Sequence, residues 1–158
     1  MGIRCTSKAV IFREGKLLLN RCRQLNGEIY YDLPGGGQHL YETMEDALTR
    51  EVREETGYTV RIVRFAGIAE EIYTSALMRE KYPEYTHRIL HLFVAECTDD
   101  PREVPAEKDL YMDECVWIPI EQVKQMRINP EGIADHLEKI VQQNKVVYLG
   151  PRMIDKID

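Results

Sequence analysis

The order of apolar and polar positions in the first part of the chain predicts a β-hairpin. Residues 8–12 and 16–19 are apolar runs of β type, and the turn-forming residues 13–15 separate them. Residues 32–37 then combine a proline with three successive glycines, so we expect no regular structure there. A strand pair followed by an irregular connection is therefore the expected start of the fold.

A helix is expected directly after the glycines. Thr43 fits an N-cap position whose capping box Asp46 completes, and acids in the first turn suit the positive end of the helix dipole. Gly57 fits a left-handed C-cap, which ends the helix. The pattern thus bounds a helix between residues 43 and 57.

The second half of the chain begins with strands and loops. Residues 60–72 and 89–97 are strand candidates, and the second is an apolar run typical of a central strand. Residues 74–86 between them are polar and irregular. Residues 98–114 form a loop with seven acids, and residues 116–118 are a further strand. Loops longer than about 12 residues in a compact domain are often functional.

Two helices are expected to end the chain. Pro119 suits the first position of a short helix that ends near Met126. Asn129 is expected to cap the next helix, with Pro130 at its first position. That helix has an apolar face at helical spacing, formed by Ile133, Leu137, Ile140 and Val141. Because strands and helices mix throughout, we expect an α/β fold with helices on both faces of the sheet.

Composition restricts the partners of the chain. Its 158 residues, 44% of them hydrophobic, suffice for one domain with one core. Acids outnumber bases 27 to 21, and a net charge of −6 disfavours a nucleic-acid polymer or an anionic membrane as partner. No apolar run approaches the roughly 20 residues that span a bilayer. A phosphate ligand would need a positive group, and a divalent metal is the usual one.

The cysteines indicate a reducing compartment. None of the four forms a C-x-x-C pair, so no zinc or redox motif is present. All lie in or beside apolar strand-like runs: Cys5, Cys22, Cys97 and Cys115. We expect buried, reduced thiols and a cytoplasmic location.

The apolar stripe of the central helix turns acidic. It begins with Met44, Ala47 and Leu48. At 100° per residue, the carboxylates that follow lie on or beside that stripe: Glu51, Glu54 and Glu55. A solvated acidic patch is the alternative, but these acids take the inward positions. Carboxylates this close repel one another unless a cation lies among them, and oxygen ligands favour Mg²⁺ or Mn²⁺.

Together with the glycines, these residues resemble the signature of the Nudix hydrolase (MutT-like) family. The signature box spans residues 36–58, with Tyr58 at a position where an aliphatic residue is commoner. Its matching positions are Gly36, Glu42, Arg50-Glu51-Val52, Glu54-Glu55 and Gly57. The resemblance implies the Nudix fold, an α/β/α sandwich around a mixed β-sheet, and a single domain over residues 1–158.

The resemblance implies metal-dependent hydrolysis, with Mg²⁺ or Mn²⁺ as cofactor. The substrate would be a nucleoside diphosphate linked to another group, such as a nucleotide sugar, a dinucleoside polyphosphate or a nucleoside triphosphate. Divalent metals neutralise such a charged linkage and lower the pKa of a bound water. Which of these small nucleotides is cleaved remains open.

The resemblance also assigns roles to residues of the box. Glu51 and Glu55 are implied metal ligands, and a backbone carbonyl at Gly36 can complete the coordination. Glu54 is implied as a further ligand or as the general base. Arg50 is implied to orient the carboxylates, with a plain helical ion pair as the alternative.

Residues around the box have supporting roles. Glu42 is expected to position the loop or a carboxylate by hydrogen bonding. Arg21, Arg23 and Gly35 are substrate-binding candidates, although strand-end arginines are as often simply exposed. Other candidates are an additional acid, at Asp113 or Glu114, and tyrosines that could stack on a base, Tyr73, Tyr82 and Tyr85.

Two other functions fit the same fold. A catalytically weak nucleotide-binding or regulatory module is the main alternative, although such proteins usually lose acids of the box and none is lost here. An isomerase-type relative acting on a prenyl diphosphate would require an altered box. The sequence leaves open whether the chain forms a homodimer.

Overall fold

The computed structural model describes residues 2–106 and 111–155. Its elements follow the chain in this order: β1 (Arg4–Arg13), β2 (Lys16–Arg23), β3 (Ile29–Asp32), β4 (Gly35–Gly37), α1 (Met44–Thr56), β5 (Val60–Tyr73), α2 (Ala76–Lys81), the 3₁₀ turn η1 (Pro83–Tyr85), β6 (His87–Cys97), β7 (Met112–Pro119), α3 (Ile120–Val123), β8 (Ile128–Asn129), α4 (Ile133–Val141) and β9 (Val147–Ile154). The expected hairpin is confirmed, since β1 and β2 pair antiparallel.

The strands form one mixed sheet that divides at this hairpin. Its order is β8-β3-β2-β1-β6-β5-β9, with β4 added to β1 and β7 added to β2. β1 and β2 pair only near their turn, from Phe12–Leu17 to Arg13–Lys16. Beyond that point β1 pairs with β4 and β6, whereas β2 pairs with β3 and β7. The two halves of the sheet therefore separate towards the start of β1.

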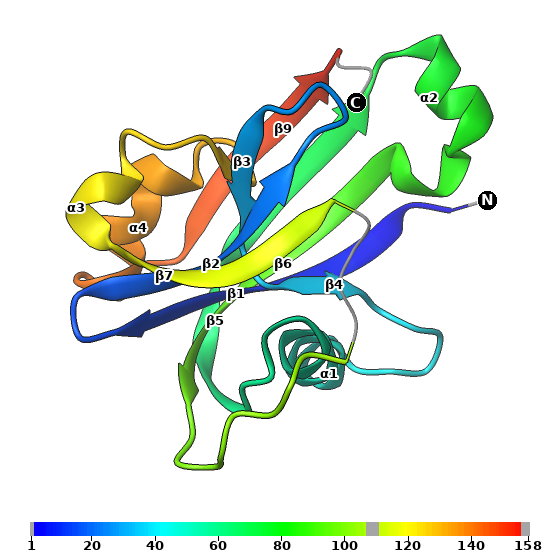
Figure 1. The fold of residues 1–158 in the computed structure, drawn as a ribbon. Coiled ribbons are helices and arrows are strands. Elements are labelled where there is room, and N and C mark those ends of the chain that lie inside the picture. Colours follow the sequence, from blue (N-terminus) through cyan, green and yellow to red (C-terminus); the bar gives the residue numbers. More distant parts are fainter. Residues whose placement is uncertain (1, 107–110, 156–158) are drawn as a thin grey trace.

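Helices cover both faces of the sheet (Figure 1). On one face, α1 buries Leu48 and Val52 against a core that includes Ile11 and Phe93. On the other face, Val123 of α3 and three residues of α4 join a larger core; these three are Ile133, Leu137 and Ile140. The expected α/β/α sandwich around a mixed sheet is confirmed. Within the described residues, no helix is long and apolar enough to cross a membrane.

Two local expectations were wrong because sheet pairing outweighs local preference. Residues 35–37 are not irregular: they form β4, which pairs with residues 6–8 of β1. Asn129 does not cap a helix. It lies in β8, where it pairs with Asp32 of β3, and its carbonyl accepts a hydrogen bond from the Leu33 amide at 3.2 Å. The last helix instead begins at Ile133, after a left-handed Gly132.

Other differences arise where the sequence carries little apolar signal. Residues 74–86 contain α2, which buries no side chain and so shows no apolar stripe, and the turn η1. Two helices were expected to end the chain, but β9 follows the second of them. It is an edge strand, which tolerates Pro151. Met44 is 37% exposed, so the buried stripe of α1 begins at Ala47. Part of the long acidic loop, residues 107–110, lies outside the described residues.

The expectation of four buried thiols holds only in part. All four cysteines are free, but only Cys22 is buried: Cys97 and Cys115 are half-buried, and Cys5 near the start of β1 is exposed. Burial raises the pKa of the Cys22 thiol to about 12 and that of Cys115 to about 11. These two thiols therefore stay protonated and unreactive at neutral pH.

Candidate active site

Helix α1 holds the acidic residues rigidly at one end of the sheet. The Thr43 side chain accepts a hydrogen bond from the Asp46 amide at 3.0 Å, and Gly57 ends the helix in the left-handed conformation, as expected. Glu55 is only 4% exposed, whereas Glu54 retains 30% of its side-chain exposure. The acids therefore range from fully enclosed to open along one face of the helix.

Arg50 binds three carboxylates and the glycine strand, which is β4 (Gly35–Gly37). Its guanidinium binds Glu42 through two hydrogen bonds of 2.7 and 3.0 Å, Nε to Oε1 and Nη2 to Oε2. Its Nη1 donates to Glu51 at 2.8 Å and to Glu54 at 3.2 Å, and its Nη2 donates to the Gly37 carbonyl at 2.9 Å. Hydrogen bonding from Arg50 lowers the pKa of Glu42 to about 2. Arg50 is thus far more than a single helical ion pair.

Glu55 is fixed from the opposite side by a residue that the sequence did not single out. Its Oε2 accepts from the Asn20 side-chain amide at 2.8 Å and from the Gly35 amide at 3.0 Å. Asn20 is buried in β2, directly after the apolar residues of that strand. The sequence did contain a signal for this role: Asn20 directly follows an apolar strand run, and a buried polar side chain needs a hydrogen-bond partner.

Lys8 is the second residue that the sequence analysis missed. It is only 7% exposed, and its ammonium donates to Asp32 at 3.0 Å, to the Leu33 carbonyl at 3.1 Å and to the Gly35 carbonyl at 3.0 Å. These three bonds use all the donors of an ammonium group. Both polar backbone groups of Gly35 are therefore engaged within the chain, one with Lys8 and one with Glu55.

The Glu51 carboxylate occupies the space that a side chain at position 36 would need, so only glycine fits there. A Cβ at Gly36 would lie 2.5 Å from Cδ of Glu51 and 2.6 Å from its Oε2. Real Cβ atoms do not approach other atoms so closely, and the obstacle here is a group that Arg50 also holds. The glycine strand therefore forms a thin wall against which the carboxylates lie.

We expect Gly36→Ala to lower turnover at least tenfold while the protein stays folded. The new methyl group would push the Glu51 carboxylate out of its place beside β4. A shift of about 1 Å in the position of a catalytic group is enough to lower the rate strongly. Steady-state kinetics and circular dichroism test this. Gly2→Ala is the control, because nothing lies within 4 Å of its Cβ position. Full activity of Gly36→Ala would contradict the assigned packing.

The residues fit a divalent metal, although they do not form a closed cage. Within residues 2–106 and 111–155, no three His, Cys, Asp or Glu side chains are grouped as a metal site. Arg50 separates Glu51 from Glu54 instead, and Glu55 turns towards Asn20. Two buried oxygens at this place lack a hydrogen-bond partner, Oδ1 of Asn20 and Oγ of Ser7. A hydrated cation among the acids would satisfy such atoms and offset the repulsion of the carboxylates.

Arg21 and Arg23, the expected phosphate contacts, share one carboxylate partner. Both reach Asp113 of β7, at 2.7 Å from Nη1 of Arg21 and 3.3 Å from Nη2 of Arg23. Asp113 is itself one of the two candidates for an additional acid. It lies at the bulge in the β2–β7 pairing, and its carboxylate pairs with both arginines. In this structure the three side chains form one group with a net charge of +1.

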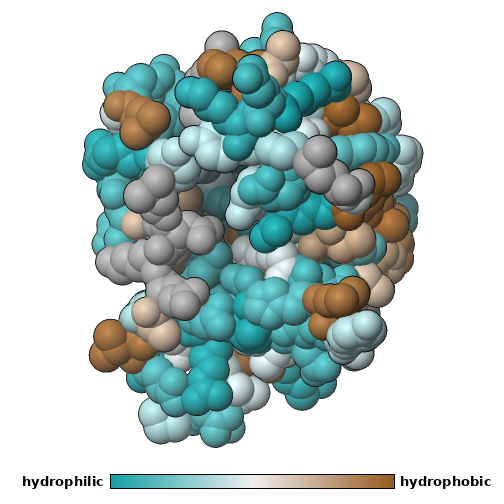
Figure 2. Space-filling model, turned by 90° about the vertical axis from the view of Figure 1, so that its right-hand side faces the viewer, coloured by the Kyte–Doolittle hydropathy of each residue, from teal (hydrophilic) through white to brown (hydrophobic). Residues whose placement is uncertain are grey.

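A cavity of about 390 Å³ opens between the two halves of the sheet, beside Asp32. Its walls combine aromatic rings with cations and amides; they include Tyr30, Tyr73, Tyr85, Tyr111, Arg88 and Arg127. Figure 2 shows a hollow with mainly hydrophilic walls on the side from which α2 projects. Asp32 binds Lys8, Lys8 binds the Gly35 carbonyl, and the Gly35 amide binds Glu55. Three contacts thus connect the cavity to the acids.

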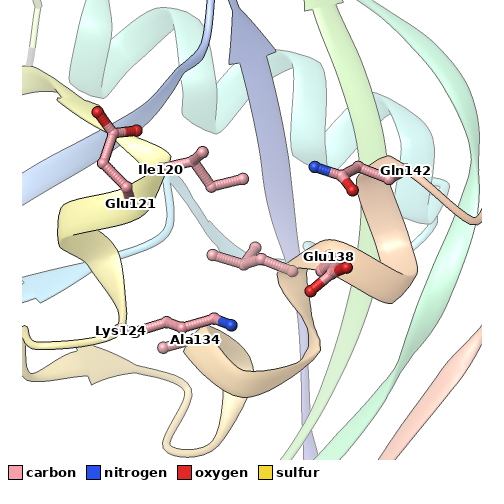
Figure 3. A pocket seen from close by; sticks show the side chains of 7 residues that line it. Ile120, Glu121, Lys124, Ala134, Glu138 and Gln142 are labelled. Carbon is pink, nitrogen blue, oxygen red and sulfur yellow. The ribbon is translucent and has the colours of Figure 1, made fainter.

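A smaller cavity of about 160 Å³ lies between α3 and α4 (Figure 3). Its polar side chains are Glu121 of α3, Lys124 directly after α3, Glu138 of α4 and Gln142 directly after α4. None of its lining residues belongs to α1 or β4, so this cavity is separate from the candidate active site.

The unusual Tyr58 belongs to an aromatic and cationic cluster behind α1. Its hydroxyl accepts from the Trp117 indole at 3.2 Å, and the guanidinium groups of Arg13 and Arg102 lie over its ring at 5.6 and 4.7 Å. Arg102 also donates to the Thr56 carbonyl at 2.9 Å. A tyrosine here thus stabilises the end of the helix without contacting the acids.

Comparison with known proteins agrees with this architecture. The family model for the NUDIX domain matches residues 5–141. The phosphatase NudJ of Escherichia coli is 28% identical over 120 residues, which are 76% of this chain and 71% of that protein. A NUDIX hydrolase from Nitrosomonas europaea superposes with a TM-score of 0.71 at 20% identity, covering 92% of this chain and 93% of its own. An ADP-ribose pyrophosphatase from Streptococcus suis superposes with a TM-score of 0.61 at 16% identity, covering 97% and 100%. At such identities the two structures show the fold alone, whereas the domain match covers most of the sequence, and the chain therefore belongs to the Nudix hydrolase family.

Proposed function

We propose that residues 1–158 form one Nudix domain that hydrolyses a nucleoside diphosphate linked to another group, with Mg²⁺ or Mn²⁺ as cofactor. The observation that carries this proposal is the complete set of carboxylates on α1, held in place by Arg50 on one side and Asn20 on the other. A purely regulatory module would not need acids that are so firmly oriented. The catalytically weak alternative is therefore less well supported.

The proposed division of labour follows the exposure of the acids. Glu51 and Glu55 would hold the metal together with Glu54 and the Gly36 carbonyl, and bound metal neutralises the phosphates and acidifies water. Glu54 is the most exposed of these three acids, so it is the best placed to take a proton from the attacking water. Arg50 and Asn20 fix the carboxylates so that they need no reorientation during the reaction.

Glu42 and the glycines complete this support. The Glu42 carboxylate holds Arg50 by two bonds and also accepts from the His39 amide at 2.9 Å, which ties the loop before α1 to the helix. The wall formed by Gly36 lets substrate approach the acids without a side chain in the way. The Gly35 amide donates to Glu55, and its carbonyl accepts from Lys8. Gly35, Arg21 and Arg23 remain our candidates for substrate contacts, and the two arginines pair with Asp113 in this structure.

The nucleoside end of the substrate is proposed to lie in the large cavity. A volume of about 390 Å³ and four tyrosines suit a flat base, and the amides of Gln24 and Asn129 supply hydrogen-bonding groups. Names of similar proteins, an ADP-ribose pyrophosphatase and a UDP-X diphosphatase, agree with a nucleotide substrate. These names do not indicate which nucleobase the substrate of this chain carries.

A substrate panel tests the proposal. Purified protein with Mg²⁺ or Mn²⁺ at mildly alkaline pH should release phosphate-containing products from at least one nucleotide sugar, dinucleoside polyphosphate or nucleoside triphosphate. Addition of EDTA should abolish the reaction, because the carboxylates alone cannot neutralise the substrate. Absence of turnover across the panel with both metals would contradict the proposed activity.

We also propose a cytoplasmic location, which four free thiols support, since disulfides are rare in that compartment. The partner we propose is a small nucleotide, and the net charge of −6 argues against a nucleic-acid polymer. A homodimer remains a prediction.

A further inference from the structure

The glycine strand separates two differently charged regions. Neighbouring residues of a strand point to opposite faces. A Cβ at Gly36 would meet the Glu51 carboxylate, whereas a Cβ at Gly37 would lie 2.6 Å from the guanidinium carbon of Arg4. One face of β4 is therefore acidic, and the other is covered by an arginine.

Arg4 lies next to two residues that line the large cavity. Its guanidinium stacks over the ring of Tyr85, with its carbon atom 4.7 Å from the ring centroid, and Tyr85 lines the cavity. Arg4 also stands opposite Arg88 in the β1–β6 ladder, and Arg88 lines the cavity as well. The stacking holds the planar guanidinium in one orientation beside the wall of glycines.

The other cations near the site already have anionic or carbonyl partners. Lys8 is bound to Asp32 and two carbonyls, Arg50 to three carboxylates, Arg88 to Glu71, and Arg21 and Arg23 to Asp113. The Arg4 side chain differs from them. Among the residues that the structure describes, it makes no hydrogen bond and no ion pair, and Tyr85 is its ring contact.

We propose that Arg4 binds a phosphate group of the substrate at the rim where the diphosphate passes from the acids to the cavity. This inference rests on the proposed function, since it assumes that one substrate spans both sides of β4. On the acidic side the metal supplies the positive charge. On the cavity side Arg4 supplies it, with a planar pair of N–H donors that matches two phosphate oxygens.

Binding of imidodiphosphate, an uncleavable diphosphate analogue without a nucleoside, tests the role of Arg4. Titration calorimetry in the presence of Mg²⁺ should show that Arg4→Gln binds it about tenfold or more weakly than the wild type. Arg4→Lys keeps the charge but not the paired donors and should give an intermediate affinity. The control is Arg61→Gln, which removes an exposed arginine that pairs with Glu96 at the other end of the sheet and should leave binding unchanged.

Imidodiphosphate binding by Arg4→Gln equal to that of the wild type would overturn the proposal. A second variant covers the case in which Arg4→Gln does not fold: Tyr85→Leu removes the stacking platform and should weaken binding about threefold. Unchanged binding by Tyr85→Leu in that case would also overturn the proposal. The proposed function fails separately, if no member of the substrate panel is cleaved while analogue binding still depends on Arg4.

Discussion

Glu54→Gln should lower kcat by about 100-fold or more and leave the fold intact, as expected for the loss of a general base or a metal ligand. Glutamine keeps the shape of the side chain and removes its charge. Its amide oxygen can still accept the 3.2 Å hydrogen bond from Arg50, so the neighbouring carboxylates should stay in place. At 30% exposure the residue contributes little to the core.

Kinetics at several Mg²⁺ concentrations distinguish the two roles of Glu54. If Glu54 acts as the base, kcat falls and the Mg²⁺ concentration for half-maximal rate is unchanged. If it is a ligand, more Mg²⁺ is required as well. Glu45→Gln is the matched control, because Glu45 is an exposed acid in the first turn of the same helix and should be dispensable. Wild-type kcat in Glu54→Gln would refute both roles.

The parts of the fold that were predicted correctly depend on local signals. The hairpin turn and both caps of α1 are short-range features, and the structure contains them as expected. The inward position of Glu55 also follows from helical spacing alone. By contrast, residues 35–37 become a strand only because β1 offers a free edge to pair with. Local patterns contain no information about such an edge.

The same division applies to the site. The acids and Arg50 lie within one helix, so their proximity can be worked out from sequence. Asn20 meets Glu55 across 35 residues of chain, and Lys8 meets Gly35 across 27. Such contacts depend on how two separate strands approach the helix. The pairing of Arg21 with Asp113, 92 residues further along, is likewise absent from any local pattern, and the substrate contact expected of Arg21 and Arg23 stays a prediction.

Lys8→Met should destabilise the protein by about 3 kcal/mol, the scale found when one partner of a buried ion pair is removed. The variant leaves the Asp32 carboxylate and two carbonyls without their common donor. Urea unfolding should show a lower midpoint with an unchanged slope. Lys16→Met is the control, because Lys16 is exposed on β2 and its loss should shift the midpoint little. An unaltered midpoint in Lys8→Met would mean that the three bonds contribute nothing net.

The stability of the wild type should also depend on Lys8 at alkaline pH. Burial alone would lower the pKa of Lys8, but the charges of Asp32 and Glu55 outweigh it and hold the pKa above the usual 10.5. A pKa raised in the folded state gives stability that is fully present below pH 10.5 and is lost as the pH rises through the folded value. Wild-type stability should therefore fall in this range more steeply than that of Lys8→Met. The free energy of unfolding of both proteins can be measured in urea at increasing pH. If it falls equally steeply with pH in the wild type and in Lys8→Met, Lys8 titrates no differently in the folded chain. The bonds that join the cavity wall to Glu55 would then not depend on the charge of Lys8.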